Sequence, residues 1–288
     1  FVQAKKDLEF PLVTEYAYDK SNRLVSMTDG EGNVTKYEYD RVGNRTSETV
    51  AFGLAGQERQ TNYTYDAANQ LVRIVSPAGG VKEFSYDAVG NAVQSRTLQS
   101  GDPNANPSSA VWITESFEYD DDGRQTAAVN GLNVRTERTF DAVGNLLSET
   151  VAAGTADVRE TRYEYNLDNQ LIAETDPLGQ RTEYTRDAMG NRIKVKDALG
   201  REAHYYFDGA NRLVAILDAE GYVNTFKYDA SGNRTEARVF MQKYSGPVDD
   251  FTVPVVAASS GDRVVTTDYD NDDNIVRVVK ADGQHIEY

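Results

Sequence analysis

The sequence holds few residues suited to acid–base or nucleophilic chemistry. Among its 288 residues are 46 acidic side chains, but only two histidines, His204 and His285, and no cysteine. A hydrolase triad needs a histidine beside a nucleophile. His204 directly precedes an aromatic pair, so we expect it to be a structural residue on a strand surface. A glycosidase needs two carboxylates at a set separation, and nothing singles out two of the 46. We therefore predict that the chain is not an enzyme and has no cofactor.

An acidic cluster near the end of the chain partly resembles a calcium-binding loop. Residues 268–273 read Asp-x-Asp-x-Asp-Asp. Such a loop needs Gly at its sixth position and Glu at its twelfth, where this chain has Asp273 and Val279. We interpret the cluster as turn chemistry, with weak cation binding as the alternative, and we interpret residues 120–122 in the same way.

Aromatic residues two positions apart are the best candidates for ligand binding. Tyrosine faces can stack on sugars, whereas the same pairs can stack on those of neighbouring hairpins and stabilise a sheet. Regular recurrence favours the second interpretation, because binding sites usually interrupt a repeat. The aromatic pattern is interrupted at three positions, where Arg138, Arg186 and Thr267 stand in place of an aromatic residue. We call the two positions of each aromatic pair rung positions. The candidate rung residues are Tyr16, Tyr18, Tyr37, Tyr39, Tyr63, Tyr65, Phe84, Tyr86, Phe117, Tyr119, Tyr163, Tyr165, Tyr205, Phe207, Phe226 and Tyr228.

An acidic residue or Asn follows each aromatic pair and sets a period of 21 residues, as between Asp19 and Asp40. A fixed period of this size indicates a repeat architecture. Residues two apart share one face of a β-strand, so each pair predicts a strand. The series is Asp19, Asp40, Asp66, Asp87, Asp120, Asp141, Asn166, Asp187, Asp208, Asp229 and Asp270.

Three residues after each of these positions stands Gly, Asn or, once, Asp. These residues adopt the left-handed backbone conformation at least cost, so Asp-x-x-Gly/Asn predicts a tight hairpin turn. The turns alternate between an Asn-Arg/Gln-Leu form and a Gly-Asn form. The series is Asn22, Gly43, Asn69, Gly90, Gly123, Gly144, Asn169, Gly190, Asn211, Gly232 and Asp273.

A second turn lies ten residues after the first in many repeats. Each 21-residue unit therefore holds two strands and two turns. We predict an all-β fold of tandem antiparallel hairpins in a ribbon that curls, because open sheets beyond about 10 strands usually do so. The second turns are residues 29–32, 76–79, 176–179, 197–200, 218–221 and 280–283.

The repeat carries a family resemblance. Residues 37–45, Tyr-x-Tyr-Asp-x-x-Gly-Asn-Arg, and 18–24, Tyr-Asp-x-x-Asn-Arg-Leu, resemble the RHS/YD-repeat family of bacterial polymorphic toxins, insecticidal-toxin shell proteins, wall-associated proteins and teneurins. The resemblance implies a hollow β-shell or spiral that encloses or displays something. Residues 176–179, Asp-Pro-Leu-Gly, are similar to an element near the self-cleavage site of such shells, but they occupy an ordinary second-turn position, so we interpret them as a turn.

We expect residues 1–288 to form a single YD-repeat domain with insertions near 52–59, 99–109, 151–158 and 240–262. The chain begins without Met, and the next Asp would fall just beyond Tyr288. We therefore expect a fragment of a longer protein, with residues 1–13 as the tail of an earlier repeat. Insertion 240–262 carries several apolar residues; it either packs on the host sheet or serves as a partner-binding or lumen-plugging element.

Charge and the family resemblance together define the expected function. A net charge of −16 argues against nucleic acid and favours solubility, with a basic partner as the alternative. No apolar run is long enough to span a membrane. The resemblance implies a non-catalytic shell segment, secreted or at a bacterial cell surface, whose partners are further YD repeats and a C-terminal effector or toxin domain. The alternative is an adhesion or carbohydrate-binding module that takes a glycan or protein ligand.

Overall fold

The computed structural model describes residues 13–287, and these confirm the all-β prediction. They form twenty-three strands and one short 3₁₀ turn, Pro107–Ser109, with no α-helix among them. Each strand that the described pairings cover is antiparallel to the next along the chain, as tandem hairpins require. The expectations for the first twelve residues and for Tyr288 lie outside the described residues.

The described residues group into two compact units. One extends to Arg138 and includes Val151–Val158; the other comprises Thr139–Thr150 and the chain from Arg159 onward. The strands up to the boundary are β1 (Glu15–Tyr18), β2 (Leu24–Thr28), β3 (Val34–Tyr39), β4 (Arg45–Val50), β5 (Arg59–Tyr65), β6 (Leu71–Val75), β7 (Val81–Tyr86), β8 (Ala92–Ser100), β9 (Val111–Tyr119), β10 (Gln125–Val129) and β11 (Arg135–Phe140).

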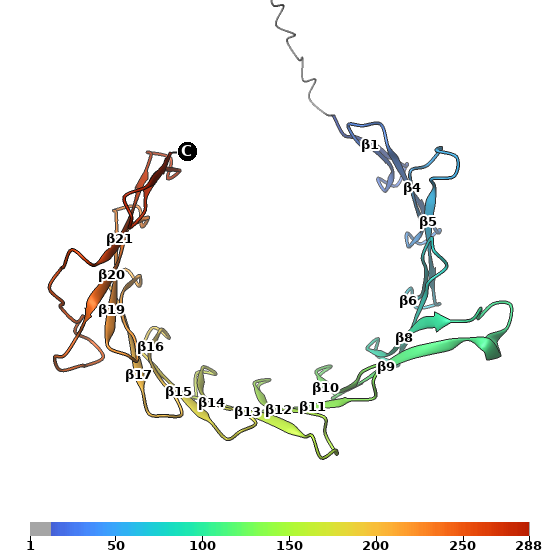
Figure 1. Ribbon diagram of the computed structural model, residues 1–288. Coiled ribbons are helices and arrows are strands. Elements are labelled where there is room, and N and C mark those ends of the chain that lie inside the picture. Colours follow the sequence, from blue (N-terminus) through green and yellow to red (C-terminus); the bar gives the residue numbers. More distant parts are fainter. Residues whose placement is uncertain (1–12, 288) are drawn as a thin grey trace, which may run out of the picture. The chain divides into compact units, whose positions relative to one another are not determined.

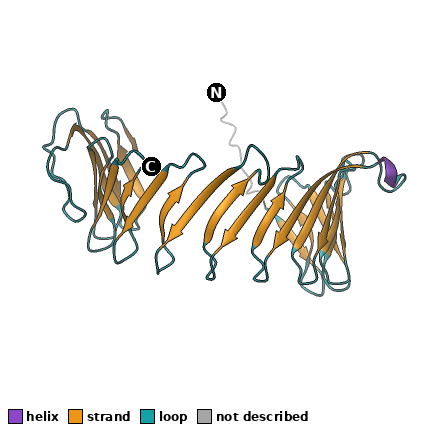
Figure 2. Ribbon diagram, turned by 90° about the horizontal axis from the view of Figure 1, so that it is seen from below, coloured by secondary structure: helices purple, strands orange, loops and turns teal. Residues whose placement is uncertain are grey.

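The second unit continues the same pattern. Its strands are β12 (Leu146–Val151), β13 (Arg159–Tyr165), β14 (Leu171–Thr175), β15 (Arg181–Arg186), β16 (Arg192–Lys196), β17 (Glu202–Phe207), β18 (Leu213–Leu217), β19 (Tyr222–Tyr228), β20 (Arg234–Lys243), β21 (Arg263–Tyr269), β22 (Ile275–Val279) and β23 (His285–Glu287). Within each unit, strands lie side by side with short turns at their ends (Figure 2). The loop between β8 and β9 projects away from its neighbours (Figure 1).

Each first-turn hairpin whose pairing is described contains a β-bulge just before the turn residue. In the β3–β4 pair, Tyr39 faces Arg45 but Glu38 faces Ser47, which leaves Thr46 without an opposite residue. The same shift recurs in both units. A bulge bends the strand and changes the direction of its side chains. It therefore sets how the second residue of each aromatic pair is presented.

The main apolar core lies in the second unit, under insertion 240–262. Tyr206, Leu217, Val223 and Phe240 are buried there around Ala215. From the insertion, Tyr244, Val253 and Val256 pack against this cluster. The packing interpretation of the insertion is therefore confirmed for these side chains.

The expected surface position of His204 is wrong. Only 6% of the residue is exposed, because the insertion covers this part of β17. Its Nδ1 lies 3.1 Å from the carboxylate of Asp250, and its Nε2 lies 3.5 Å from Glu202. The neighbouring Tyr206 donates its hydroxyl to the Asp249 carbonyl at 3.1 Å. The contacts with Asp249 and Asp250 hold the insertion on the strand.

Candidate functional site: the turn and rung network

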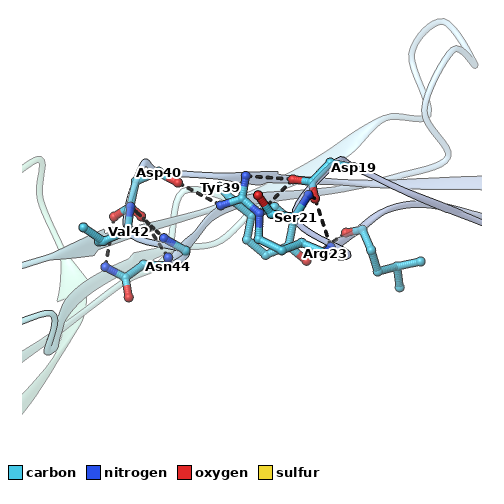
Figure 3. A network of polar contacts seen from close by, with 9 residues as sticks. Asp19, Ser21, Arg23, Tyr39, Asp40, Val42 and Asn44 are labelled. Carbon is cyan, nitrogen blue, oxygen red and sulfur yellow. Dashed lines mark hydrogen bonds and ion pairs between the residues drawn. The ribbon is translucent and has the colours of Figure 1, made fainter.

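The first turns use the acidic residue as an acceptor for several backbone amides. In the turn that starts at Asp19, one carboxylate oxygen accepts from the amides of Ser21 and Arg23 at 2.8 and 3.0 Å. The amide of Asn22 donates to the Asp19 carbonyl, and Asn22 has a φ of 59°. This is a type I turn closed by a left-handed residue. The Asp40 turn repeats it, with amides from Val42 to Asn44 on the Asp40 carboxylate (Figure 3).

The structure places the other first-turn residues in the same way. The fourth residue donates its amide to the carbonyl of the first, and its φ is positive. The turns are Asp66–Asn69, Asp87–Gly90, Asp120–Gly123, Asp141–Gly144, Asn166–Asn169, Asp187–Gly190, Asp208–Asn211, Asp229–Gly232 and Asp270–Asp273. In the Asp19 turn, the hydrogen bond from the Arg23 amide is the main cause that lowers the carboxyl pKa of Asp19. The side chain of Arg212 acts likewise on Asp208. These carboxylates are engaged within their own turns.

Side chains also join one first turn to the next, and this explains the two alternating forms. In the Asn-Arg-Leu form, the Arg23 guanidinium donates to the Asp40 carbonyl of the following turn at 3.0 Å, and Arg212 does the same to Asp229 at 3.1 Å. In the Gly-Asn form, the side-chain amide of Asn44 donates to that of Asn69 at 3.0 Å. The same Asn-to-next-turn bond recurs at Asn145, Asn191 and Asn233.

Gly190 should tolerate an added side chain about as well as a left-handed glycine with open space around it. Its φ is +89°, and an added Cβ would lie 2.6 Å from the side-chain amide of Gln170 in the preceding turn. That amide is the end of a flexible side chain, which can move aside. Gly200 has a similar φ of +79° and open space around it. Left-handed strain should therefore cost Gly190→Ala and Gly200→Ala about 1 kcal/mol each, measured by urea unfolding of both variants. A clearly larger loss in Gly190→Ala would show that the Gln170 side chain is held in place.

In six repeats, a tyrosine at the second rung position links adjacent hairpins through its hydroxyl. The Tyr39 hydroxyl donates to the carbonyl of Leu24 at 2.8 Å, and Leu24 is the residue paired with Tyr18 at the preceding bulge. The sequence pattern identified the aromatic pairs but not this role; its signal is the frequent choice of Tyr over Phe at the second position. The other bonds are Tyr65 to Arg45, Tyr86 to Leu71, Tyr119 to Ala92, Tyr228 to Leu213 and Tyr269 to Arg234.

Arginine side chains cover many of the rung faces. The Arg23 guanidinium lies 4.9 Å from the Tyr39 ring centre, and Arg45 lies between Tyr37 and Tyr63 at 5.6 and 5.0 Å. Such cation–π contacts hold the rungs together. Burial raises the pKa of several rung tyrosines, including Tyr37 and Tyr163. Tyr16 and Tyr18 on β1 are more than half exposed.

Removal of one rung hydroxyl should weaken the ribbon by a measurable amount. We expect Tyr228→Phe to lose about 1 kcal/mol, because its hydroxyl bonds the Leu213 carbonyl at 2.8 Å and Phe leaves that acceptor unpaired. The control is Tyr205→Phe, since the Tyr205 hydroxyl bonds no described residue and should change stability little. Hydrogen exchange of the β18 and β19 amides gives the comparison; equal protection in both variants would exclude the role of the hydroxyl.

One second turn escaped the sequence pattern. Residues 130–133 read Asn-Gly-Leu-Asn, and Asn133 takes the left-handed position with a φ of 60°. The Asn130 carboxamide accepts from the amides of Leu132 and Val134. The turn was missed because it begins with Asn and ends without Gly. Residues 176–179 form a second turn, with the Asp176 carboxylate accepting from the amides of Leu178 and Gln180.

The acidic cluster at 268–273 serves its turn. The Asp270 carboxylate accepts from the amides of Asp272 and Asn274, both at 2.9 Å. Among residues 13–287, no group of three or more His, Asp or Glu side chains is placed to hold a metal ion. The same part of the chain contains no helix with the length and apolar character of a membrane span.

Comparison with known proteins identifies a family and several structures that these repeats resemble. The RHS Repeat family model matches residues 18–55, 65–102, 165–202 and 207–239, just over half of the chain. No curated protein matches the sequence. A crystal structure of TcdB2-TccC3-Cdc42 matches with a TM-score of 0.69 at 14% identity, and the Photorhabdus luminescens Tc holotoxin pore with TccC3-D651A with a TM-score of 0.68 at 15% identity. Each alignment covers 95% of this chain and 15% of the other chain.

A third similar structure is TcdB2-TccC3 without its hypervariable C-terminal region, with a TM-score of 0.69 at 14% identity. At such identities the likeness concerns the fold alone. The matched family segments, in contrast, contain eight of the eleven first turns, from Asp19, Asp40, Asp66, Asp87, Asn166, Asp187, Asp208 and Asp229. On the extent of that family match, the chain belongs to the RHS repeat family.

Proposed function

We propose that this chain is a non-catalytic wall segment of an RHS-repeat shell that encloses or displays a C-terminal effector or toxin domain of the same protein. The observation that supports this most is how the repeat uses its polar groups. Turn carboxylates bind their own backbone amides, and rung hydroxyls bind the carbonyl of the preceding hairpin. A side chain that holds the backbone in this way stabilises a wall and is not free for catalysis.

The partners follow from the same proposal. Further YD repeats continue the wall, and the effector follows it in the chain. The net charge of −16 disfavours nucleic acid as cargo or ligand. We assign the protein to the outside of a bacterial cell, secreted or at its surface, by analogy with the Tc holotoxin to which its fold is similar.

Two experiments on the natural protein test this function. The gene downstream of the Tyr288 codon should encode more YD repeats and then a domain without them. In the purified full-length protein, that domain should resist a protease that cleaves the same domain rapidly when it is expressed alone. If the gene encoded no such domain, both enclosure and display would be contradicted. If the domain were present but cleaved at the same rate in both forms, enclosure alone would be contradicted and display would remain.

A further inference from the structure

The second turn at residues 130–133 contains a reactive dipeptide. Asn130 and Gly131 form the only Asn-Gly pair in the 288 residues, and the whole turn is exposed. In such a pair the backbone nitrogen of the glycine can attack the side-chain carbonyl carbon of the asparagine. Because both groups belong to one dipeptide, the attack needs no encounter of two molecules. The turn decides whether the reacting groups are free for this step.

The turn holds the Asn130 side chain with its oxygen on two amide donors. Oδ1 of Asn130 accepts from the amides of Leu132 and Val134, both at 3.0 Å. Attack on Cγ moves negative charge onto this oxygen, and fixed donors that point at developing charge stabilise the intermediate. Nδ2 of Asn130 donates to no described residue, so its departure as ammonia breaks no hydrogen bond within residues 13–287.

The attacking nitrogen of Gly131 is free as well. Its amide donates to no residue in the described part of the chain, so a base in the solvent can remove its proton without breaking such a bond. A Cβ at Gly131 would overlap Cγ2 of Ile113 on β9, and the β-branched Ile113 side chain has restricted freedom to move aside. Glycine therefore fits this position, and no side chain of its own hinders the approach of its nitrogen to the Asn130 Cγ.

An earlier second turn already has the residue that deamidation would produce. Asp29 and Gly30 occupy the corresponding positions there, and the Asp29 carboxylate accepts from the amides of Glu31 and Asn33 at 2.9 and 2.8 Å. An aspartate in place of Asn130 would keep the two amide bonds of its turn and make them charge-assisted. Isoaspartate would instead add a methylene to the main chain and disturb the pairing of β10 with β11. The folded turn therefore favours aspartate as the product.

We propose that Asn130 is a site of spontaneous deamidation, which gives its turn the negative charge that the Asp29 turn already has. The Gly131 nitrogen loses its proton to a base in the solvent and forms a bond to the Asn130 Cγ. The Cγ–Nδ2 bond breaks, Nδ2 takes a proton from water and leaves as ammonia, and a cyclic succinimide remains. Water then adds to a carbonyl of the ring. The product is aspartate where the Gly131 nitrogen leaves Cγ, and isoaspartate where it leaves the backbone carbonyl carbon.

Asn166 is a matched control within the same chain. Its Oδ1 accepts from the amides of Asp168 and Gln170 at 3.0 and 2.9 Å, so its carboxamide is held as that of Asn130 is. Leu167 follows Asn166, however, and the Asn166 Nδ2 donates to the Gln170 side chain at 3.1 Å. The Leu167 side chain hinders the attack, and the leaving group must give up a hydrogen bond. We therefore expect Asn130 to convert about tenfold faster than Asn166, or more.

The test is peptide mapping by mass spectrometry after the whole folded chain has stood in mildly alkaline buffer made with heavy-oxygen water. The peptide with Asn130 should exchange its amide group for a heavy oxygen, which shows that hydrolysis took place during the incubation. Electron-transfer fragmentation should identify mostly aspartate. The peptide with Asn166 should stay unchanged over the same period. In urea, the unfolded chain should give a larger share of isoaspartate at position 130, because no turn then favours aspartate.

Two variants complete the experiment. Asn130→Ser takes the residue that Ser76 supplies in another second turn, and its peptide should incorporate no heavy oxygen. Asn130→Asp contains the expected product and should unfold at no lower urea concentration than the unchanged protein. If Asn130 stayed intact in the folded chain, or if Asn166 converted equally fast, the proposal would be overturned. Equal shares of isoaspartate with and without urea, or a less stable Asn130→Asp, would overturn the part of it that assigns aspartate as the product.

Discussion

Phe240→Ala should destabilise the second unit by about 3–5 kcal/mol, the usual cost of truncating a buried large aromatic side chain. Phe240 is 8% exposed and belongs to the cluster that includes Tyr206 and Val223. It stands where β20 runs into insertion 240–262. Its loss removes apolar contacts on the strands and opens a cavity beneath the insertion. Hydrogen exchange of the β17–β20 amides in the whole chain should show the loss as a lower local opening free energy.

Phe251→Ala is the matched control for this measurement. Phe251 belongs to the same insertion but is 86% exposed, so its truncation should change stability by no more than about 0.5 kcal/mol. If both variants were equally stable, the insertion would not contribute to the core. Loss of amide protection confined to Phe240→Ala would show that the contacts of this residue support strands β17–β20.

The base of the insertion is anchored independently of its apolar contacts. The Asp262 carboxylate accepts from the amide and hydroxyl of Ser259 and from the amide of Met241, and it pairs with Arg238 at 3.3 Å. The Ser259 hydroxyl and amide are the main cause of a pKa of about 2 at Asp262. A carboxyl whose pKa is lowered on folding contributes stability above its unfolded pKa and loses it as pH falls through the folded value. This anchor therefore remains charged in weak acid.

The fold was predictable because its rules are local. Gly and Asn at fixed intervals after an acidic residue demand left-handed corners, and aromatic residues two apart demand strands. Neither rule depends on what lies far away in the sequence. The all-β hairpin architecture is confirmed on that basis. Asn130 shows the limit of the rule, since its turn has neither the aromatic pair that precedes Asn166 nor the Gly that closes the second turns identified from the sequence.

The remaining features depend on contacts between repeats. The bond from Tyr39 to Leu24 exists only because a bulge presents that carbonyl to the next hairpin. A sequence pattern shows the tyrosine but not the bulge. The burial of His204 depends on insertion 240–262 folding back over β17, and the insertion has no period from which its path could be inferred. Arg186 was visible as an interruption, but its bonds to the Leu171 and Gly190 carbonyls require coordinates.

Substitution of Tyr206 should also have a large effect on stability. This residue lies between the rung residues Tyr205 and Phe207 in β17. It is 2% exposed, faces the fully buried Ala215 across the β17–β18 pair, and donates to the Asp249 carbonyl. Tyr206→Ala should destabilise this region by about 3 kcal/mol or more, as for other buried aromatic residues. Tyr206→Phe should lose about 1 kcal/mol, because only the hydrogen bond is removed. A smaller loss for Ala than for Phe would contradict the packing.

The dependence of stability on alkaline pH tests whether the Tyr206 hydroxyl is buried in the folded chain. Burial is the main cause that raises the Tyr206 pKa to about 12, assisted by Asp249 and Asp250, whereas an exposed tyrosine ionises near pH 10. Between those values the unfolded chain has lost a proton that the folded chain keeps, so stability falls as pH rises through this window. Tyr206→Phe cannot ionise there. Its urea midpoint should therefore decline less steeply than that of the unchanged protein between about pH 10 and 12. Parallel declines would mean that Tyr206 meets solvent in the folded chain and that the insertion does not cover β17.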